Sequence, residues 1–119
     1  MSGEVKPQYR KSDRVPIILE VNCKTEMHFL NAKTKNVSVG GMFIPTLYPL
    51  PEGTEINLRF SIPEVSIEFS VDAQIVWSIS YEECQNEFES GMGIKLINLD
   101  KEKSRILENY LESKAKELS

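Results

Sequence analysis

The chain has 119 residues, enough for one domain with a single hydrophobic core. Hydrophobic residues make up 40% of it and charged residues 27%, as is usual for a globular protein. Residues 1–14 hold four basic and two acidic side chains, whereas the rest of the chain holds 10 basic and 16 acidic ones. This distribution argues against a general DNA- or RNA-binding protein, which needs an extended basic face. It is compatible with a small anion held locally by the N-terminal region.

Several other classes of protein are excluded by what the sequence lacks. No apolar run approaches the ~18 residues of a membrane span, and residues 1–4 do not resemble a signal peptide, so we expect a cytoplasmic protein. Cys23 and Cys84 are far apart and His28 is the only histidine, which is too few ligands for a metal site. The sequence offers neither a catalytic Ser–His–Asp set nor a glycine-rich phosphate loop, which predicts a non-enzymatic protein without a cofactor.

The first half of the chain predicts three strands behind a short arm. Residues 1–8 show no apolar periodicity and are expected to form a flexible arm, ahead of one domain over residues 9–119. Alternating apolar side chains predict a strand over Val15–Lys24. A second strand is expected over about His28–Val37, where Phe29, Leu30 and Ala32 are apolar. A short third strand, Met42–Ile44, is cut off by a proline-rich loop.

Three more strands are predicted in the second half. Apolar residues alternate cleanly over Thr54–Ile62 and at seven successive positions of period two over Ile67–Ile79. Trp77 shares that period and is interpreted as a core residue, with stacking on a ligand as the alternative. An acidic loop over Tyr81–Glu89 separates this strand from a sixth, Gly91–Ile97.

One helix is predicted, from Lys101 to about Glu117, with Asp100 as its N-cap. Its apolar residues fall on one stripe that should dock on the sheet, namely Ile106, Leu107, Tyr110, Leu111 and Leu118. The elements together predict a mainly β protein, a six-stranded antiparallel β-barrel with a C-terminal α-helix.

Two short motifs flank the first predicted hairpin. Arg10 and Arg14 lie four residues apart, and Asn36, Ser38 and Gly41 follow after the hairpin. Together they resemble the two-part signature of the PilZ domain, the bacterial receptor module for cyclic di-GMP. The family writes it as R-x-x-x-R, followed some residues later by D/N-x-S-x-x-G. The resemblance extends over about residues 9–100.

The resemblance implies that Arg10 and Arg14 bind the guanines and phosphates of cyclic di-GMP. An arginine fork matches the adjacent guanine acceptors O6 and N7, and its plane stacks on a purine. Asn36 and Ser38 are then expected to contact the ligand or the arginines. Gly40 and Gly41 are expected to leave room for the ligand, Lys11 to contact a phosphate and Tyr9 to pack on a base. In this family the residue before the first arginine biases the stoichiometry, and Tyr9 favours one ligand per chain.

Other interpretations of the same residues stay open. The arginines alone could be solvated charges, Asn36 and Ser38 could serve an ordinary turn, and Lys33 and Lys35 could be solvated or reach a phosphate. The function expected from the resemblance is a receptor that changes conformation on binding cyclic di-GMP and signals to a partner protein. The alternatives are a ligand-free PilZ-like scaffold and, more remotely, an unrelated barrel that binds protein or oligosaccharide.

Overall fold

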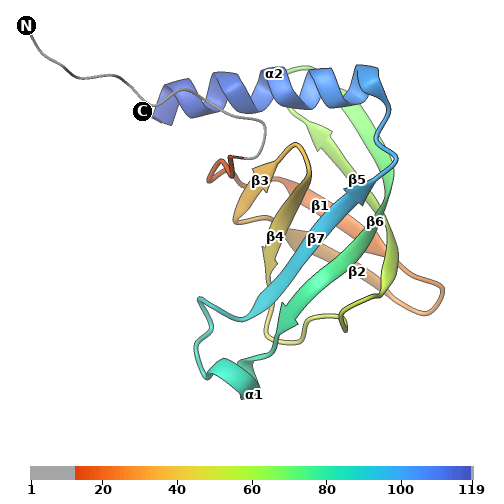
Figure 1. Cartoon of the computed structure of the whole chain (residues 1–119), viewed down its shortest axis with the longest axis vertical. Helices are drawn as coiled ribbons and strands as arrows, with labels where there is room; N and C mark the ends of the chain where they lie inside the picture. Colours follow the sequence, from red (N-terminus) through yellow and green to blue (C-terminus); the bar gives the residue numbers. More distant parts are fainter. Residues whose placement is uncertain (1–12, 119) are drawn as a thin grey trace, which may run out of the picture.

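The computed structural model describes residues 13–118 (Figure 1). The predicted arm over residues 1–8 and three predicted ligand-binding residues, Tyr9, Arg10 and Lys11, lie outside the described residues. The described part contains seven strands and two helices, namely β1 (Glu20–Lys24), β2 (Phe29–Lys33), β3 (Asn36–Ser38), β4 (Gly41–Pro45), β5 (Glu55–Ile62), β6 (Ile67–Ile79), α1 (Tyr81–Cys84), β7 (Gly91–Ile97) and α2 (Lys101–Leu118).

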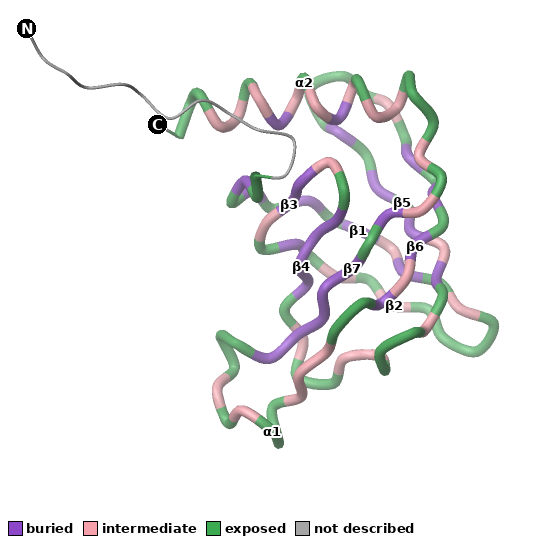
Figure 2. Tube along the Cα trace, viewed as in Figure 1, coloured by how far each residue is buried: buried purple, intermediate pink, exposed green. Residues whose placement is uncertain are grey.

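The strands form one antiparallel sheet in the order β2-β1-β5-β6-β7-β4-β3. The sheet curls into a half-barrel, with helix α2 lying across one of its ends (Figure 1). Buried and exposed residues alternate along β5 and β6, so one face of each strand lines the core (Figure 2). The mainly β class and the C-terminal helix predicted from the sequence are therefore correct.

The predicted count of six strands is wrong, because the segment expected as one strand over His28–Val37 forms two. Its division falls at Thr34, whose buried hydroxyl accepts from the Leu19 amide and donates to the Ile17 carbonyl, both at 2.9 Å. The Thr34 amide also donates to the Leu19 carbonyl at 3.0 Å. These side-chain bonds replace part of the strand ladder, and the chain passes from β2 to β3 at this point.

The first predicted strand is also shorter than expected. Strand β1 begins at Glu20, and Val15 instead forms an isolated antiparallel bridge to Val37. Pro16 carries no amide proton, and the chain turns tightly around it because the Ile17 amide donates to the Val15 carbonyl at 2.8 Å. The predicted alternation nevertheless persists, since Val15, Ile17 and Leu19 are all buried.

Helix α2 begins as predicted, with the Asp100 carboxylate accepting from the Lys103 amide at 2.7 Å. Leu107 and Leu111 are fully buried against the sheet, whereas Leu118, expected on the same stripe, is exposed at the end of the helix. The Lys114 ammonium lies 2.7 Å from the Glu64 carboxylate in the β5–β6 turn, which fixes the helix laterally. Neither described helix is long and apolar enough to cross a membrane.

Candidate functional site

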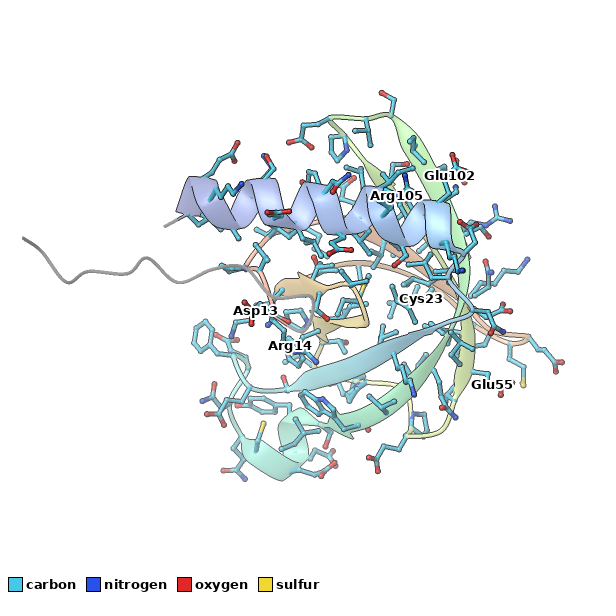
Figure 3. The ribbon with its side chains drawn as sticks, turned by 45° about the horizontal axis from the view of Figure 1, so that its top comes forward. Asp13, Arg14, Cys23, Glu55, Glu102 and Arg105 are labelled. Carbon is cyan, nitrogen blue, oxygen red and sulfur yellow. The ribbon has the colours of Figure 1, made fainter. Side chains whose placement is uncertain are left out.

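Arg14 and Asn36, one from each predicted motif, are in direct contact. The Arg14 guanidinium donates from Nη1 to Oδ1 of Asn36 at 2.9 Å, across 22 residues of sequence. Arg14 is exposed and Asn36 is half-buried, so the contact lies at the protein surface. In Figure 3 the Arg14 side chain lies beside the β3–β4 hairpin. The two halves of the signature are therefore neighbours in space, as far as the described residues extend.

Two backbone hydrogen bonds hold this contact in place. The Val15 amide donates to the Val37 carbonyl at 2.8 Å, and the Val37 amide donates to the Val15 carbonyl at 2.9 Å. Both valine side chains are buried in the core. Because neighbouring residues of a strand point to opposite faces, burial of Val15 and Val37 directs Arg14 and Asn36 outward. The apolar pattern of the sequence thus sets the direction of the polar pair.

The β3–β4 hairpin carries the other residues of the second motif. Ser38 is buried and its hydroxyl donates to the Gly41 carbonyl at 3.3 Å, across the turn formed by Val39 and Gly40. A side chain at Gly41 has no room, because its Cβ would lie 2.1 Å from the Ile94 carbonyl oxygen on β7. Gly40 is exposed, and a methyl group added there would meet no atom within 4 Å. Gly41 therefore has a packing role of its own, and Gly40 leaves an open surface.

A cross-strand row of residues extends this site over the outer face of the sheet. Asn36 is paired with Phe43 on β4, Phe43 with Gly93 on β7, and Gly93 with Trp77 on β6. The rings of Phe43 and Trp77 are stacked, with centroids 5.3 Å apart and an interplanar angle of 19°. Gly93 makes this possible, because a Cβ there would lie 2.1 Å from the indole Nε1. A polar end at Asn36 and an aromatic end at Trp77 thus belong to one surface.

The interpretation of Trp77 as a core residue is wrong. The register of β6 against β7 shifts between Ile75 and Trp77, and this β-bulge turns the indole from the inner to the outer face. Trp77 is 39% exposed, whereas Ile75, two residues earlier, is buried. A period-two pattern cannot reveal such a bulge, because the apolar alternation in the sequence continues through it.

Two exposed lysines lie next to the β3–β4 hairpin. Lys35 directly precedes Asn36, and Lys95 is paired with Gly41 from the neighbouring strand β7. With Arg14 they provide three basic side chains around the hairpin, a suitable setting for a small anion. Sequence reasoning missed Lys95, Phe43 and Gly93. The signal in the sequence that could have found them is the Gly-x-Gly spacing at the start of Gly91–Ile97, because glycine in a strand is typical of a close backbone approach.

The described residues form an open hollow away from the signature, and they form no group of metal ligands. An open hollow of about 730 Å³ lies over β1, β5 and β6, and none of the signature residues line it. Within residues 13–118, no group of His, Cys, Asp or Glu side chains is arranged to hold a metal ion. The chemistry available at the signature is therefore hydrogen bonding, charge and aromatic stacking.

Comparison with known proteins agrees with this geometry. The PilZ domain family model matches residues 8–113. The structure is similar to that of the Bacillus subtilis inhibitor of motility MotI/DgrA, with a TM-score of 0.75 and 15% identity over 93% of this chain. The match covers 53% of the MotI/DgrA chain, so this chain spans about half of that protein.

Two single PilZ domains are similar over nearly their whole length. The PilZ domain of YcgR from Escherichia coli, solved with cyclic di-GMP, has a TM-score of 0.66 and 18% identity, over 93% of this chain and 95% of that one. The PilZ domain of CeSA from a cellulose-synthesizing bacterium has a TM-score of 0.62 and 14% identity, over 86% and 97%. No curated protein matches significantly. The family match spans most of the chain, and the chain belongs to the PilZ domain family.

Proposed function

We propose that this protein is a receptor for cyclic di-GMP, which changes conformation on binding and signals to a partner protein. PilZ domains are binding domains, and among the structurally similar proteins two YcgR structures contain cyclic di-GMP. The observation that carries the proposal is the contact between Arg14 and Asn36, because it joins the two halves of the signature on an outward-facing surface.

In the proposed complex, Arg14 supplies the fork that recognises guanine. Guanine presents O6 and N7 as adjacent acceptors, and a guanidinium carries five donors in one plane. The bond that Arg14 donates to Asn36 uses one of these donors and fixes the orientation of that plane. Such preorganisation lowers the entropy that is lost on binding. Asn36 therefore acts on the ligand through the arginine as well as by direct contact.

The remaining contacts of the proposed site come from the hairpin, the lysines and the region before Arg14. Gly40 leaves the hairpin surface open to the ligand, while Lys35 and Lys95 add positive charge near the phosphodiesters. The described surface also offers the exposed ring of Trp77, stacked on the buried Phe43, as an apolar wall. From the family signature, Arg10, Lys11 and Tyr9 are proposed to complete the site from the preceding segment, with Tyr9 favouring one ligand per chain.

Calorimetric titration with cyclic di-GMP tests the proposal. We expect saturable binding in the sub-micromolar to micromolar range, about −8 kcal/mol or somewhat stronger, with a stoichiometry near one. A titration with 5′-GMP serves as the control, because it offers one guanine and no second base. Absence of heat at high micromolar cyclic di-GMP would refute the receptor and leave the ligand-free scaffold as the function.

A further inference from the structure

Two loops lie at the end of the sheet opposite α2 (Figure 1), and both expose large apolar side chains. The β4–β5 loop presents Tyr48, which is 82% exposed, and the segment that follows α1 presents Phe88, which is 73% exposed. Leu47 and Tyr81 are also exposed. Exposed aromatic residues that gather in one place are typical of protein-binding surfaces. We refer to residues 46–48 and 80–90 as the loop-end surface.

Hydrogen bonds between the two loops make this a single surface. The Tyr81 amide donates to the Leu47 carbonyl, and the Thr46 amide donates to the Ser90 carbonyl, both at 3.3 Å. The two segments are therefore neighbours in space although more than 30 residues separate them in the sequence.

The exposure of Phe88 follows from an ordered local structure. Ser80 and Glu83 form a capping box at the start of α1, and Gln85 ends this helical turn in a left-handed conformation with φ of 52°. The side-chain Oδ1 of Asn86 then accepts from the Phe88 amide at 2.8 Å, and the backbone carbonyl of Asn86 accepts from the Ser90 amide at 3.0 Å. The backbone on both sides of Phe88 is thus fixed, and the ring is held outward.

The charge of these loops indicates the chemistry of an occupant. Residues 46–48 and 80–90 contain four glutamates and no Lys, Arg or His. The four in the second segment, Glu82, Glu83, Glu87 and Glu89, are all exposed. An acidic surface with apolar centres is complementary to a segment that combines basic and apolar side chains. It repels nucleic acid and anionic lipid, and it also repels the same surface of a second copy.

The loop-end surface is continuous with the candidate ligand site. Strand β4 carries Phe43 and ends at Pro45, directly before the loop that holds Leu47. Strand β6 carries Trp77 and ends at Ile79, shortly before α1. A ligand that displaces the Phe43–Trp77 stack therefore acts on the two strands that lead into these loops.

We propose that the loop-end surface is the docking site for the partner protein, which it recognises through a segment that carries Lys or Arg beside aromatic or aliphatic side chains. The inference rests on one part of the proposed function, namely that the protein signals to a partner protein. It does not depend on the other part, namely that cyclic di-GMP is the ligand.

Binding of a labelled synthetic peptide, followed by fluorescence anisotropy, tests this docking site. The probe is an amphipathic 16-residue peptide with Lys and Arg on one face and Leu and Phe on the other, and a second peptide replaces its basic residues by Glu. We expect the basic peptide to bind at least tenfold more tightly than the acidic one, with an affinity that falls as salt is raised. Equal affinities for the two peptides would overturn the proposal.

Two sets of variants locate the binding. Replacing Tyr48 and Phe88 together by Ser is expected to weaken binding of the basic peptide at least tenfold. The matched control replaces Met27 and Phe29 by Ser, because these are also highly exposed apolar residues at another edge of the sheet, and it should leave binding unchanged. Equal losses in both variants would show that the peptide binds no defined surface and would refute the docking site.

A charge reversal covers the case in which the double serine variant fails to fold. The variant with Glu87→Lys and Glu89→Lys keeps both aromatic side chains and the capping box, and it should lose the preference for the basic peptide, because its two lysines balance Glu82 and Glu83. An unchanged preference would overturn the inference. Calorimetry with cyclic di-GMP on the same preparations separates the two proposals, since ligand binding without peptide selectivity refutes only the docking site.

Discussion

Arg14 donates from Nη1 to the Oδ1 of Asn36 at 2.9 Å, and this bond joins a segment before the sheet to strand β3. The reciprocal backbone bonds between Val15 and Val37 lie directly beside it. The signature residues are therefore attached to each other by the fold itself. In the proposed receptor, this bond would orient the arginine plane for recognition of the ligand.

The first prediction separates the shape of Arg14 from its charge. Arg14→Lys keeps the positive charge but loses the planar fork, so we expect it to weaken cyclic di-GMP binding nearly as much as Arg14→Ala does, by roughly 2 kcal/mol or more. Calorimetry of both variants measures this. Arg59→Ala is the control, because Arg59 is an exposed arginine on β5 outside the signature. A lysine variant that binds like the unmodified chain would show that simple charge attraction is sufficient.

Trp77 provides a direct optical test of the row that begins at Asn36. It is the only tryptophan in the chain, it is 39% exposed, and it stacks on Phe43. A ligand that covers this row should change the tryptophan emission with the same midpoint as the calorimetric titration. Arg14→Ala should abolish the change at the same ligand concentration. Calorimetric saturation without any change in emission would place the ligand away from Trp77.

The two glycines of the hairpin should respond very differently to substitution by alanine. At Gly41 the added methyl group meets the Ile94 carbonyl oxygen at 2.1 Å, so β4 and β7 must separate, and we expect a loss of about 2–4 kcal/mol in the free energy of unfolding. At Gly40 the space is open, and a change within about 0.5 kcal/mol is expected. Urea denaturation measures both. Equal stability of the two variants would contradict the close approach at Gly41.

Gly40→Ala also tests the open surface proposed for the ligand. Because this variant should fold with normal stability, any loss of cyclic di-GMP affinity can be assigned to the binding surface rather than to unfolding. We expect weaker binding, since the methyl group occupies the space proposed for the ligand. Unchanged affinity would remove Gly40 from the binding site and leave Arg14 and Asn36 in it.

Much of the fold could be predicted because burial imposes a period of two on each strand. The strands Ile67–Ile79 and Gly91–Ile97 have the predicted bounds, and the Asp100 cap is confirmed. The division of one predicted strand at Thr34 was not predictable, since it depends on hydrogen bonds to Ile17 and Leu19, which are 15 or more residues away. Local patterns do not contain such long-range bonds.

For the candidate site, the structure adds neighbours that the sequence did not indicate. The resemblance to the family signature implied that Arg14 and Asn36 belong together, and the structure places them in contact. Phe43, Gly93 and Lys95 joined the site only through the pairing of β4 with β7, and Trp77 only through a bulge in β6. Cross-strand neighbours depend on register, which a single sequence does not specify.

The buried thiol of Cys23 gives a prediction on reactivity and on pH. Burial raises the pKa of Cys23 to about 11, so the thiolate that reacts with alkylating agents is suppressed in the folded state. At pH 8, iodoacetamide should label the native chain at Cys84 at most, and both cysteines only in denaturant. Labelling of Cys23 in the native chain would contradict its burial.

The same shift predicts how stability depends on pH. A folded pKa above the unfolded value of about 9 means that the folded state holds the proton more tightly. Stability from this group is therefore complete below pH 9 and falls as the pH rises toward 11, by roughly 2–3 kcal/mol. Urea denaturation between pH 8 and 11 tests this, with Cys23→Ala as the control that should lose stability less steeply. Parallel slopes for the two proteins would refute the assignment.

The last prediction concerns the step that converts binding into a signal. The amides of Val15 and Val37 are hydrogen-bonded to each other's carbonyls, so they should exchange slowly with and without cyclic di-GMP. Ligand-dependent change is therefore expected ahead of this pair, where Arg10 and Lys11 gain anionic and guanine partners, and in the hairpin that holds Gly40. Hydrogen exchange should show new protection in residues 8–14 and around 36–42, and little change in 67–79. If residues 8–14 exchange equally with and without cyclic di-GMP, no segment is ordered by the ligand, and the signal must instead pass through the Phe43–Trp77 stack to the loop-end surface.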